Sequence, residues 1–139
     1  MKMFLGEYFP TVTNGSRLAL PKKLRDQITG DDAILSKGFE KCIFLYDRSD
    51  WMQEAVKHVE NPISDPSTRE LKRYMYSSAS EISIDGQGRL VLPQSLKDYA
   101  HIGEKVAVIG AGDHIEIWDI DLWQEHLVKI SDNFANGGN

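Results

Sequence analysis

The sequence predicts a mostly β protein with short helices, of the α+β class, built from two tandem repeats that fold together. One motif occurs twice, as TNGSRLALP at residues 13–21 and as DGQGRLVLP at residues 85–93, and the offset continues without a gap to Trp51 and Trp123. Across residues 12–58, twelve positions match their counterparts, whereas average composition would give about three. The matching positions of the first copy are Arg17, Leu18, Leu20, Pro21, Leu24, Asp26, Gly38, Ile43, Asp47, Trp51, Val56 and Lys57. Period-two alternation before the second copy and a Leu-Pro pair at the end of both copies are the other two observations.

The first repeat begins with an edge strand and a tight turn. Residues 4–13 mix aromatic, polar and β-branched side chains, which favour a strand. Asn14 and Gly15 both tolerate a positive φ, so the chain is expected to reverse there and return as a strand over 17–20. Thr13 and Gly15 are therefore assigned to the structure of this turn.

The second repeat is expected to reproduce this hairpin. Residues 80–84 alternate polar and apolar side chains, the chain turns over 85–88, and it returns as a strand over 89–92. The residues assigned to the structure of the second turn are Asp85, Gly86 and Gly88.

Helices and further strands follow each Leu-Pro pair. Proline suits the first helical turn, which predicts short helices over 22–26 and 94–98. Two more strands are expected in each repeat, over 33–36 and 41–46, and over 106–109 and 114–118. A helix closes each repeat, with Ser49 and Asp121 as predicted N-caps and Gln124 placed to complete a capping box.

The chain divides into two halves and a connector. Residues 1–62 form the first half and 80–131 the second, and an Asp-Pro pair at 65–66 predicts a connecting helix within 63–79. Residues 132–139 offer little to pack and are expected to be a flexible tail. Neither half could cover its own sheet face and edges, so the halves are expected to fold as one unit.

Composition limits the possible function classes. The 139 residues are 41% hydrophobic, enough for a core without staples, and the single cysteine, Cys42, excludes an intrachain disulfide. No export signal or long apolar run is present, so we expect a cytoplasmic protein that does not bind membranes. The net charge of −5 argues against indiscriminate nucleic-acid binding, but residues 1–30 carry five basic and two acidic side chains. A charged segment of this kind is more often a solvated surface than a binding site.

Other candidate chemistry is sparse. The four histidines lack partners at metal-ligand spacing, so no metal and no cofactor are expected. Residues 85–88 lack the strand-to-helix context of a dinucleotide loop, and Cys42 has no nearby histidine to activate it. We therefore expect no catalytic residue and no small-molecule substrate. Trp51 and Trp123 are expected to anchor the core or subunit contacts.

Several motifs together resemble the MraZ family of bacterial transcriptional regulators. These motifs are MFLGEY at 3–8, the two hairpin motifs, GFEKC at 38–42 leading to Trp51, and IEIW at 115–118 leading to Trp123. The resemblance covers nearly the whole chain. It implies an AbrB-like swapped-hairpin β-barrel, in which hairpins of the two halves interleave about a pseudo-twofold axis. It also implies closed homo-oligomeric rings.

The resemblance further implies a function in the nucleoid. Members of the family bind double-stranded DNA at short repeated boxes upstream of their own cell-division and cell-wall gene cluster, usually as repressors. The arginine of the first hairpin motif is among the family's DNA contacts; here it is Arg17, and Arg89 is its counterpart. With the local positive charge, the predicted DNA-binding residues are Arg17, Lys22, Lys23, Arg25 and Arg89.

The first turn departs from the family pattern. Thr13, Gly15 and Ser16 replace the usual aspartate, lysine and glycine. Loss of the aspartate frees Arg17 from a bidentate pair, whereas Asp85 still accompanies Arg89, so Arg17 is expected to dominate DNA contact. The alternatives are a ring-forming protein-interaction scaffold that has lost tight DNA binding and a small enzyme on a related barrel. An exposed apolar patch would favour the scaffold, and a concave pocket with perturbed acids would favour the enzyme.

Overall fold

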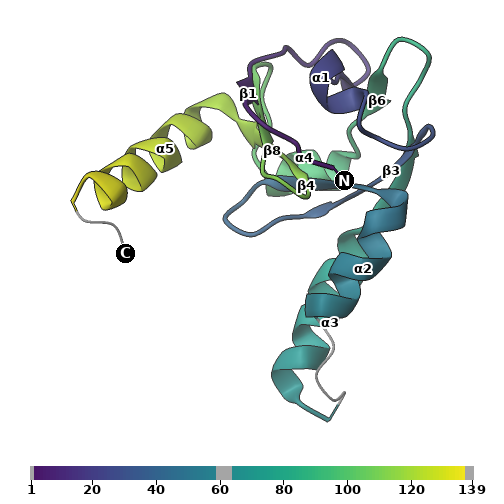
Figure 1. Ribbon diagram of the computed structural model, residues 1–139, viewed down its shortest axis with the longest axis vertical. Coiled ribbons are helices and arrows are strands. Elements are labelled where there is room, and N and C mark those ends of the chain that lie inside the picture. Colours follow the sequence, from purple (N-terminus) through teal and green to yellow (C-terminus); the bar gives the residue numbers. More distant parts are fainter. Residues whose placement is uncertain (1, 59–63, 137–139) are drawn as a thin grey trace.

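The computed structural model describes residues 2–58 and 64–136, so the predicted boundary at 62–63 and the end of the predicted tail lie outside the described part. The strands are β1 (Glu7–Tyr8), β2 (Arg17–Ala19), β3 (Asp32–Lys37), β4 (Ile43–Asp47), β5 (Ser80–Ser83), β6 (Arg89–Val91), β7 (Val106–Gly110) and β8 (Ile115–Asp119). The helices are α1 (Lys22–Arg25), α2 (Arg48–His58), α3 (Pro66–Ser78), α4 (Gln94–Tyr99) and α5 (Ile120–Ala135). The body is mostly β with helices attached to it, as the repeats predict (Figure 1).

The strands form two separate antiparallel sheets. One has six strands in the order β1-β7-β8-β4-β3-β5, and the other is a ribbon of β2 and β6. Among the described residues β1 and β5 are free edges, so backbone hydrogen bonds do not close the sheet, and the expectation of a closed barrel is wrong. The short β1 ends before Pro10, which has no N–H to extend a ladder.

Strand pairing crosses between the two repeats. β1 pairs with β7, with Tyr8 opposite Val108, and β5 pairs with β3, with Ser83 opposite Asp32. β2 pairs with β6, although the sequence predicts that each returning strand pairs within its own hairpin. At the first turn, only a single bridge joins Thr13 to Arg17. The ladder that each returning strand forms is therefore with its counterpart from the other repeat.

A core lies between the ribbon and the six-stranded sheet. Leu18 and Leu90 are partners in the ribbon and point inward together, and both are buried. The other leucines that match between the repeats belong to the same core cluster. They are Leu20 with Leu92 and Leu24 with Leu96. Full burial of such a side chain contributes about 1.5–3 kcal/mol. The leucines that match between the repeats thus hold the ribbon on the sheet.

A second core cluster is aromatic and lies where the longer helices join the sheet. It contains Tyr46, Trp51, Trp118 and Trp123, and the two rings of Trp118 and Trp123 lie 5.4 Å apart. The prediction that Trp51 and Trp123 are anchors is confirmed for the core, because both side chains are buried.

The helix starts differ from the prediction by two residues. Asp47 accepts a hydrogen bond from the backbone N–H of Ser49 at 3.2 Å, and Asp119 accepts one from Asp121 at the same distance. The caps are therefore the last strand residues, because both helices begin directly where the strand ends. The connecting helix α3 is capped by Asp65, as predicted.

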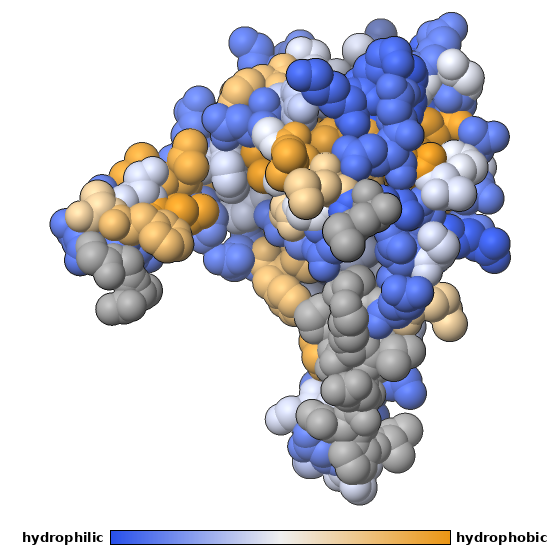
Figure 2. Space-filling view, in the orientation of Figure 1, coloured by the Kyte–Doolittle hydropathy of each residue, from blue (hydrophilic) through white to orange (hydrophobic). Residues whose placement is uncertain are grey.

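The long helices project from the body. Figure 1 shows α2 and α3 extending together on one side and α5 extending separately on another, while α1 and β6 lie at the opposite end from α2 and α3. The last helix is still regular at Ala135, beyond Ser131, where the sequence predicts a tail. Apolar side chains gather along α5 in Figure 2, and Val128 and Phe134 are exposed there.

Candidate nucleic-acid interface

The β2–β6 ribbon places both motif arginines on one exposed face. Arg17 lies opposite Val91, and Ala19 lies opposite Arg89. Because side chains alternate along a strand, these four residues point away from the core when Leu18 and Leu90 point into it. Arg17 and Arg89 form a diagonal pair, and such neighbours lie about 7–8 Å apart. The ribbon thus joins two residues that stand far apart in the sequence.

The first turn leaves the Arg17 side chain without an ion pair among the described residues. Its Nη1 donates to the backbone oxygen of Asn14 at 3.3 Å, and the Thr13 hydroxyl donates to the backbone oxygen of Arg17 at 3.3 Å. Positive φ values occur at Gly15 and Ser16, not at Asn14 and Gly15 as predicted. The reason is that backbone bonds between Thr13 and Arg17 enclose three loop residues, so the left-handed positions move one residue on.

The second turn holds Arg89 tightly. Asp85 accepts hydrogen bonds from the backbone N–H groups of Gln87 and Arg89 and from Nε of Arg89, each at 2.9 Å. The backbone bond from Arg89 leads the interactions that keep the pKa of Asp85 below its usual value. Gly88 has a φ of +79°, whereas Gly86 has no left-handed φ and a Cβ added there would meet nothing within 4 Å, so only Gly88 of the two requires glycine.

Each short helix sends a basic side chain to the turn of the other repeat. The Arg25 side chain lies against Gly88, where an added Cβ would meet Cδ of Arg25 at 2.6 Å. Nζ of Lys97 donates to the Ser16 hydroxyl at 2.8 Å. Arg25 and Lys97 occupy equivalent repeat positions, as do Ser16 and Gly88. The contacts are therefore reciprocal, and each repeat supports the turn of the other.

Lys97 was missed by the sequence reasoning. It lies outside the basic N-terminal segment, and its own repeat contains enough acidic residues to hide it. The signal that could have found it is its equivalence to Arg25, which was assigned to DNA binding.

The remaining predicted residues lie on α1. Lys22 is exposed and pairs with Asp26 at 2.6 Å, one turn later on the same helix. Lys23 is exposed as well. An exposed ion pair of this kind contributes little and is easily exchanged for another anion.

All five predicted DNA-binding residues therefore belong to the ribbon and its adjoining helix. With Lys97, the ribbon and the two short helices that follow its strands carry six basic side chains, which are Arg17, Lys22, Lys23, Arg25, Arg89 and Lys97. The acidic residues in the same two segments, 17–26 and 85–98, are Asp26, Asp85 and Asp98. We call these six basic residues the basic ribbon end. A positive surface on a chain of net charge −5 is a surface suited to a polyanion.

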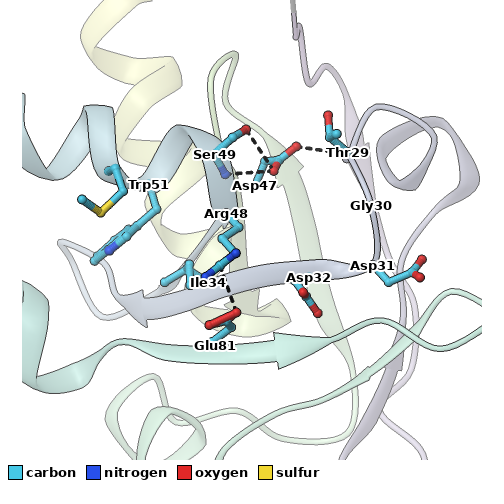
Figure 3. A pocket seen from close by; sticks show the side chains of 11 residues that line it. Thr29, Gly30, Asp31, Asp32, Ile34, Asp47, Arg48, Ser49, Trp51 and Glu81 are labelled. Atoms are coloured by element: carbon cyan, nitrogen blue, oxygen red, sulfur yellow. Dashed lines mark hydrogen bonds and ion pairs between the residues drawn. The ribbon is translucent and has the colours of Figure 1, made fainter.

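A hollow at the start of α2 contains several acidic residues, but its polar groups stabilise the fold (Figure 3). Asp47 accepts from the backbone N–H of Thr29 at 2.7 Å and pairs with Lys2 at 3.1 Å. Burial alone would raise the pKa of Asp47, but these bonds outweigh it and lower the pKa. Arg48 pairs with Glu81 at 3.0 Å across the hollow.

The described residues contain neither a metal-ligand cluster nor a membrane-spanning helix. Within residues 2–58 and 64–136, no group of three or more His, Cys, Asp or Glu side chains is arranged to hold a metal ion. In the same part of the chain, no helix combines the length and apolarity needed to cross a bilayer.

Comparison with known proteins agrees with the two repeats. The family model described as "MraZ protein, putative antitoxin-like" matches residues 3–74 and 75–138. The chain is 40% identical over 130 residues to the transcriptional regulator MraZ of Herpetosiphon aurantiacus, which covers 94% of this chain and 90% of the relative. It is 37% identical over 140 residues to the transcriptional regulator MraZ of Finegoldia magna, with 99% and 97% covered. It is 36% identical over 131 residues to the protein of the same name from Roseiflexus sp. (strain RS-1), with 94% and 91% covered.

The family matches extend over both copies of the hairpin motif, and these relatives align over at least nine tenths of both chains. The chain belongs to the MraZ family.

Proposed function

We propose that this protein is a sequence-specific DNA-binding transcriptional regulator that contacts double-stranded DNA through the basic ribbon end. The observation that carries the proposal is the exposed ribbon face with Arg17 and Arg89 on it, supported from the adjoining helices by Arg25 and Lys97. The relatives named as transcriptional regulators support the same function.

The ribbon has a size and chemistry that suit the major groove. B-form DNA has a major groove about 12 Å wide, which admits a two-stranded ribbon. Arginine reads the O6 and N7 atoms of guanine with two donors, so a guanidinium without a carboxylate partner is better suited to a base edge. Arg17 meets this condition, and Arg89, held by Asp85, is better suited to shaping its turn.

Regulation is proposed to act through an assembly on repeated sites. A single ribbon end offers few contacts, and several subunits in a closed ring would raise the effective concentration at successive DNA boxes. We therefore propose repression at repeated boxes upstream of the protein's own cell-division and cell-wall gene cluster. The protein would then be cytoplasmic and associated with the nucleoid. No cofactor, membrane or small-molecule substrate has a part in this proposal.

The pairing of strands between repeats supports an AbrB-like swapped-hairpin arrangement of the two halves, 1–62 and 80–131, joined through 63–79. The supporting pairs are β1 with β7, β3 with β5, and β2 with β6. Isolated fragments 1–62 and 67–139 are accordingly expected to be disordered or aggregated. Cooperative thermal unfolding of either fragment would contradict a shared fold.

Fluorescence anisotropy tests the DNA-binding proposal. A duplex from upstream of the protein's own gene is titrated with the parent, with Arg17→Ala, with Arg89→Ala and with a control, Arg73→Ala, on the exposed surface of α3. Arg17→Ala is expected to cost about 1–3 kcal/mol per engaged subunit and to reduce the preference for the upstream duplex over a scrambled one, with Arg89→Ala costing less. The control is expected to bind as the parent does.

Light scattering on each variant separates loss of contact from loss of assembly. Unchanged binding by Arg17→Ala with its ring intact would remove Arg17 from the interface. A parent protein that forms rings but binds the upstream duplex no better than a scrambled one would favour the scaffold, whose specific support is the exposed apolar surface of α5.

A further inference from the structure

We propose that Val91 is a specificity-determining residue that contacts the C5-methyl group of a thymine, beside the base edge that Arg17 reads. The inference rests on the proposed function and adds to it the identity of one recognised base. Arg17 and Val91 are direct partners in the ribbon register and share its exposed face. The Cβ atoms of such partners lie about 4.5–5.5 Å apart, and bases stack about 3.4 Å apart along a strand. The two side chains can therefore reach the same or adjacent base pairs.

Val91 is a large apolar side chain on the exposed face of the ribbon. Its neighbour Leu90 fills the core, whereas the Val91 side chain is 51% exposed. Basic residues surround it, since Arg17 stands opposite and Arg89 lies two residues earlier on the same face. The apolar Val91 side chain forms no favourable contact with a DNA phosphate. The thymine methyl is the apolar group that the major groove offers.

The two repeats make the argument specific to one side of the ribbon. The repeat counterpart of Val91 is Ala19, which lies opposite Arg89. That side pairs a small side chain with an arginine already held by Asp85. The other side pairs the larger apolar side chain with the arginine that has no carboxylate partner among the described residues. Val91 and Arg17 thus form one reading unit, for a thymine next to an arginine-read base.

Uracil substitution tests this contact because it removes only the C5-methyl group. Each thymine of the upstream duplex is replaced in turn by uracil, and binding is measured for the parent, for Val91→Ala and for a control, Val128→Ala. The control makes the same change at an exposed valine on α5, away from the ribbon. Equal urea midpoints establish that both variants are folded.

We expect one thymine position at which uracil weakens the parent about fourfold, the factor given by burial of one methyl group. Val91→Ala is expected to lose a similar factor on the unmodified duplex and to be insensitive to uracil at that position. Val128→Ala is expected to keep the parent's sensitivity. If Val91→Ala shows the same pattern of uracil effects as the parent, or the parent shows none, the inference is overturned while specific binding stands. If the parent does not prefer the upstream duplex over a scrambled one, the proposed function fails and the inference with it.

Discussion

Replacing Asp47 by alanine should destabilise the fold far more than the same change at its repeat counterpart, Asp119. The Asp47 side chain is 1% exposed, and it caps α2 through Ser49 and accepts a part-buried hydrogen bond from the backbone N–H of Thr29. Loss of the cap costs about 1 kcal/mol, and a part-buried N–H left without its acceptor costs about 1–3 kcal/mol more. Lys2 would lose one of its two carboxylate partners. The expected total is about 2–4 kcal/mol.

Asp119→Ala is the matched control. Asp119 makes the same kind of cap, through Asp121, and also accepts from Gly103 at 3.1 Å, but this site is open to water. Water can replace the lost acceptor, so a cost of about 1 kcal/mol is expected. Urea unfolding followed by tryptophan fluorescence, at one fixed protein concentration, measures both variants. Equal costs, or a cost below about 1 kcal/mol for Asp47→Ala, would refute the argument.

The pH dependence gives a second check on Asp47. Because its folded-state pKa is lowered, its contribution is fully present above the unfolded value of about 3.9 and is lost as the pH falls through the folded value. The difference in unfolding free energy between the parent and Asp47→Ala should therefore be constant from pH 5 to 7, to within about 0.5 kcal/mol, and shrink below about pH 4. If the difference in unfolding free energy stays the same at low pH, the charge of the Asp47 carboxylate is not what stabilises the fold.

Further predictions concern the second turn, the partly buried His114 and the assembly. Gly88→Ala should cost about 1–2 kcal/mol in urea unfolding, because the φ of Gly88 is left-handed and Arg25 occupies the space that a Cβ would need. Gly86→Ala should change stability by less than about 0.5 kcal/mol. Equal effects of the two substitutions would contradict this account. Burial alone lowers the pKa of His114, but bonds to two neighbouring carboxylates raise it, so its contribution is full below about pH 6.5 and lost as the pH rises through the folded value. The stability gap between the parent and His114→Gln should shrink from pH 6 to 9, and a gap that grows would reverse the assignment. Light scattering should give a closed higher oligomer at micromolar concentration, and a monodisperse monomer would remove the ring.

Local structure could be predicted well from the repeats, because it depends on neighbouring residues. The turns at residues 13–17 and 85–89, the short helices after Pro21 and Pro93, and the connecting helix after Asp65 all follow from residues close in the chain. Two aspartates that match between the repeats turned out to be helix caps. The sequence does not single them out, because Ser49 and Asp121 are equally good capping residues by type and nothing local fixes where a strand ends.

The pairing of strands between the two repeats could not be predicted. Alternation in β2 shows that Leu18 faces a core, but it does not show that Leu90, rather than a residue before the turn, lies opposite. The same limit hid Lys97, which contacts Ser16 only because the two repeats pack together. The basic ribbon end is therefore a product of tertiary structure, although its arginines stand out in the sequence.

Photo-cross-linking from the centre of the ribbon tests the central claim most directly. Cys42 is the chain's only cysteine and is fully buried, and burial raises the pKa of its thiol, so an added surface cysteine can be labelled selectively. Ala19→Cys carries a photoreactive label on the exposed ribbon face, and Gln124→Cys carries it on the exposed side of α5. The account predicts cross-links to the upstream duplex from position 19 and none from position 124, with the former suppressed by unlabelled duplex of the same sequence. Cross-links from position 124 but not from position 19 would place the DNA on another surface and contradict the account.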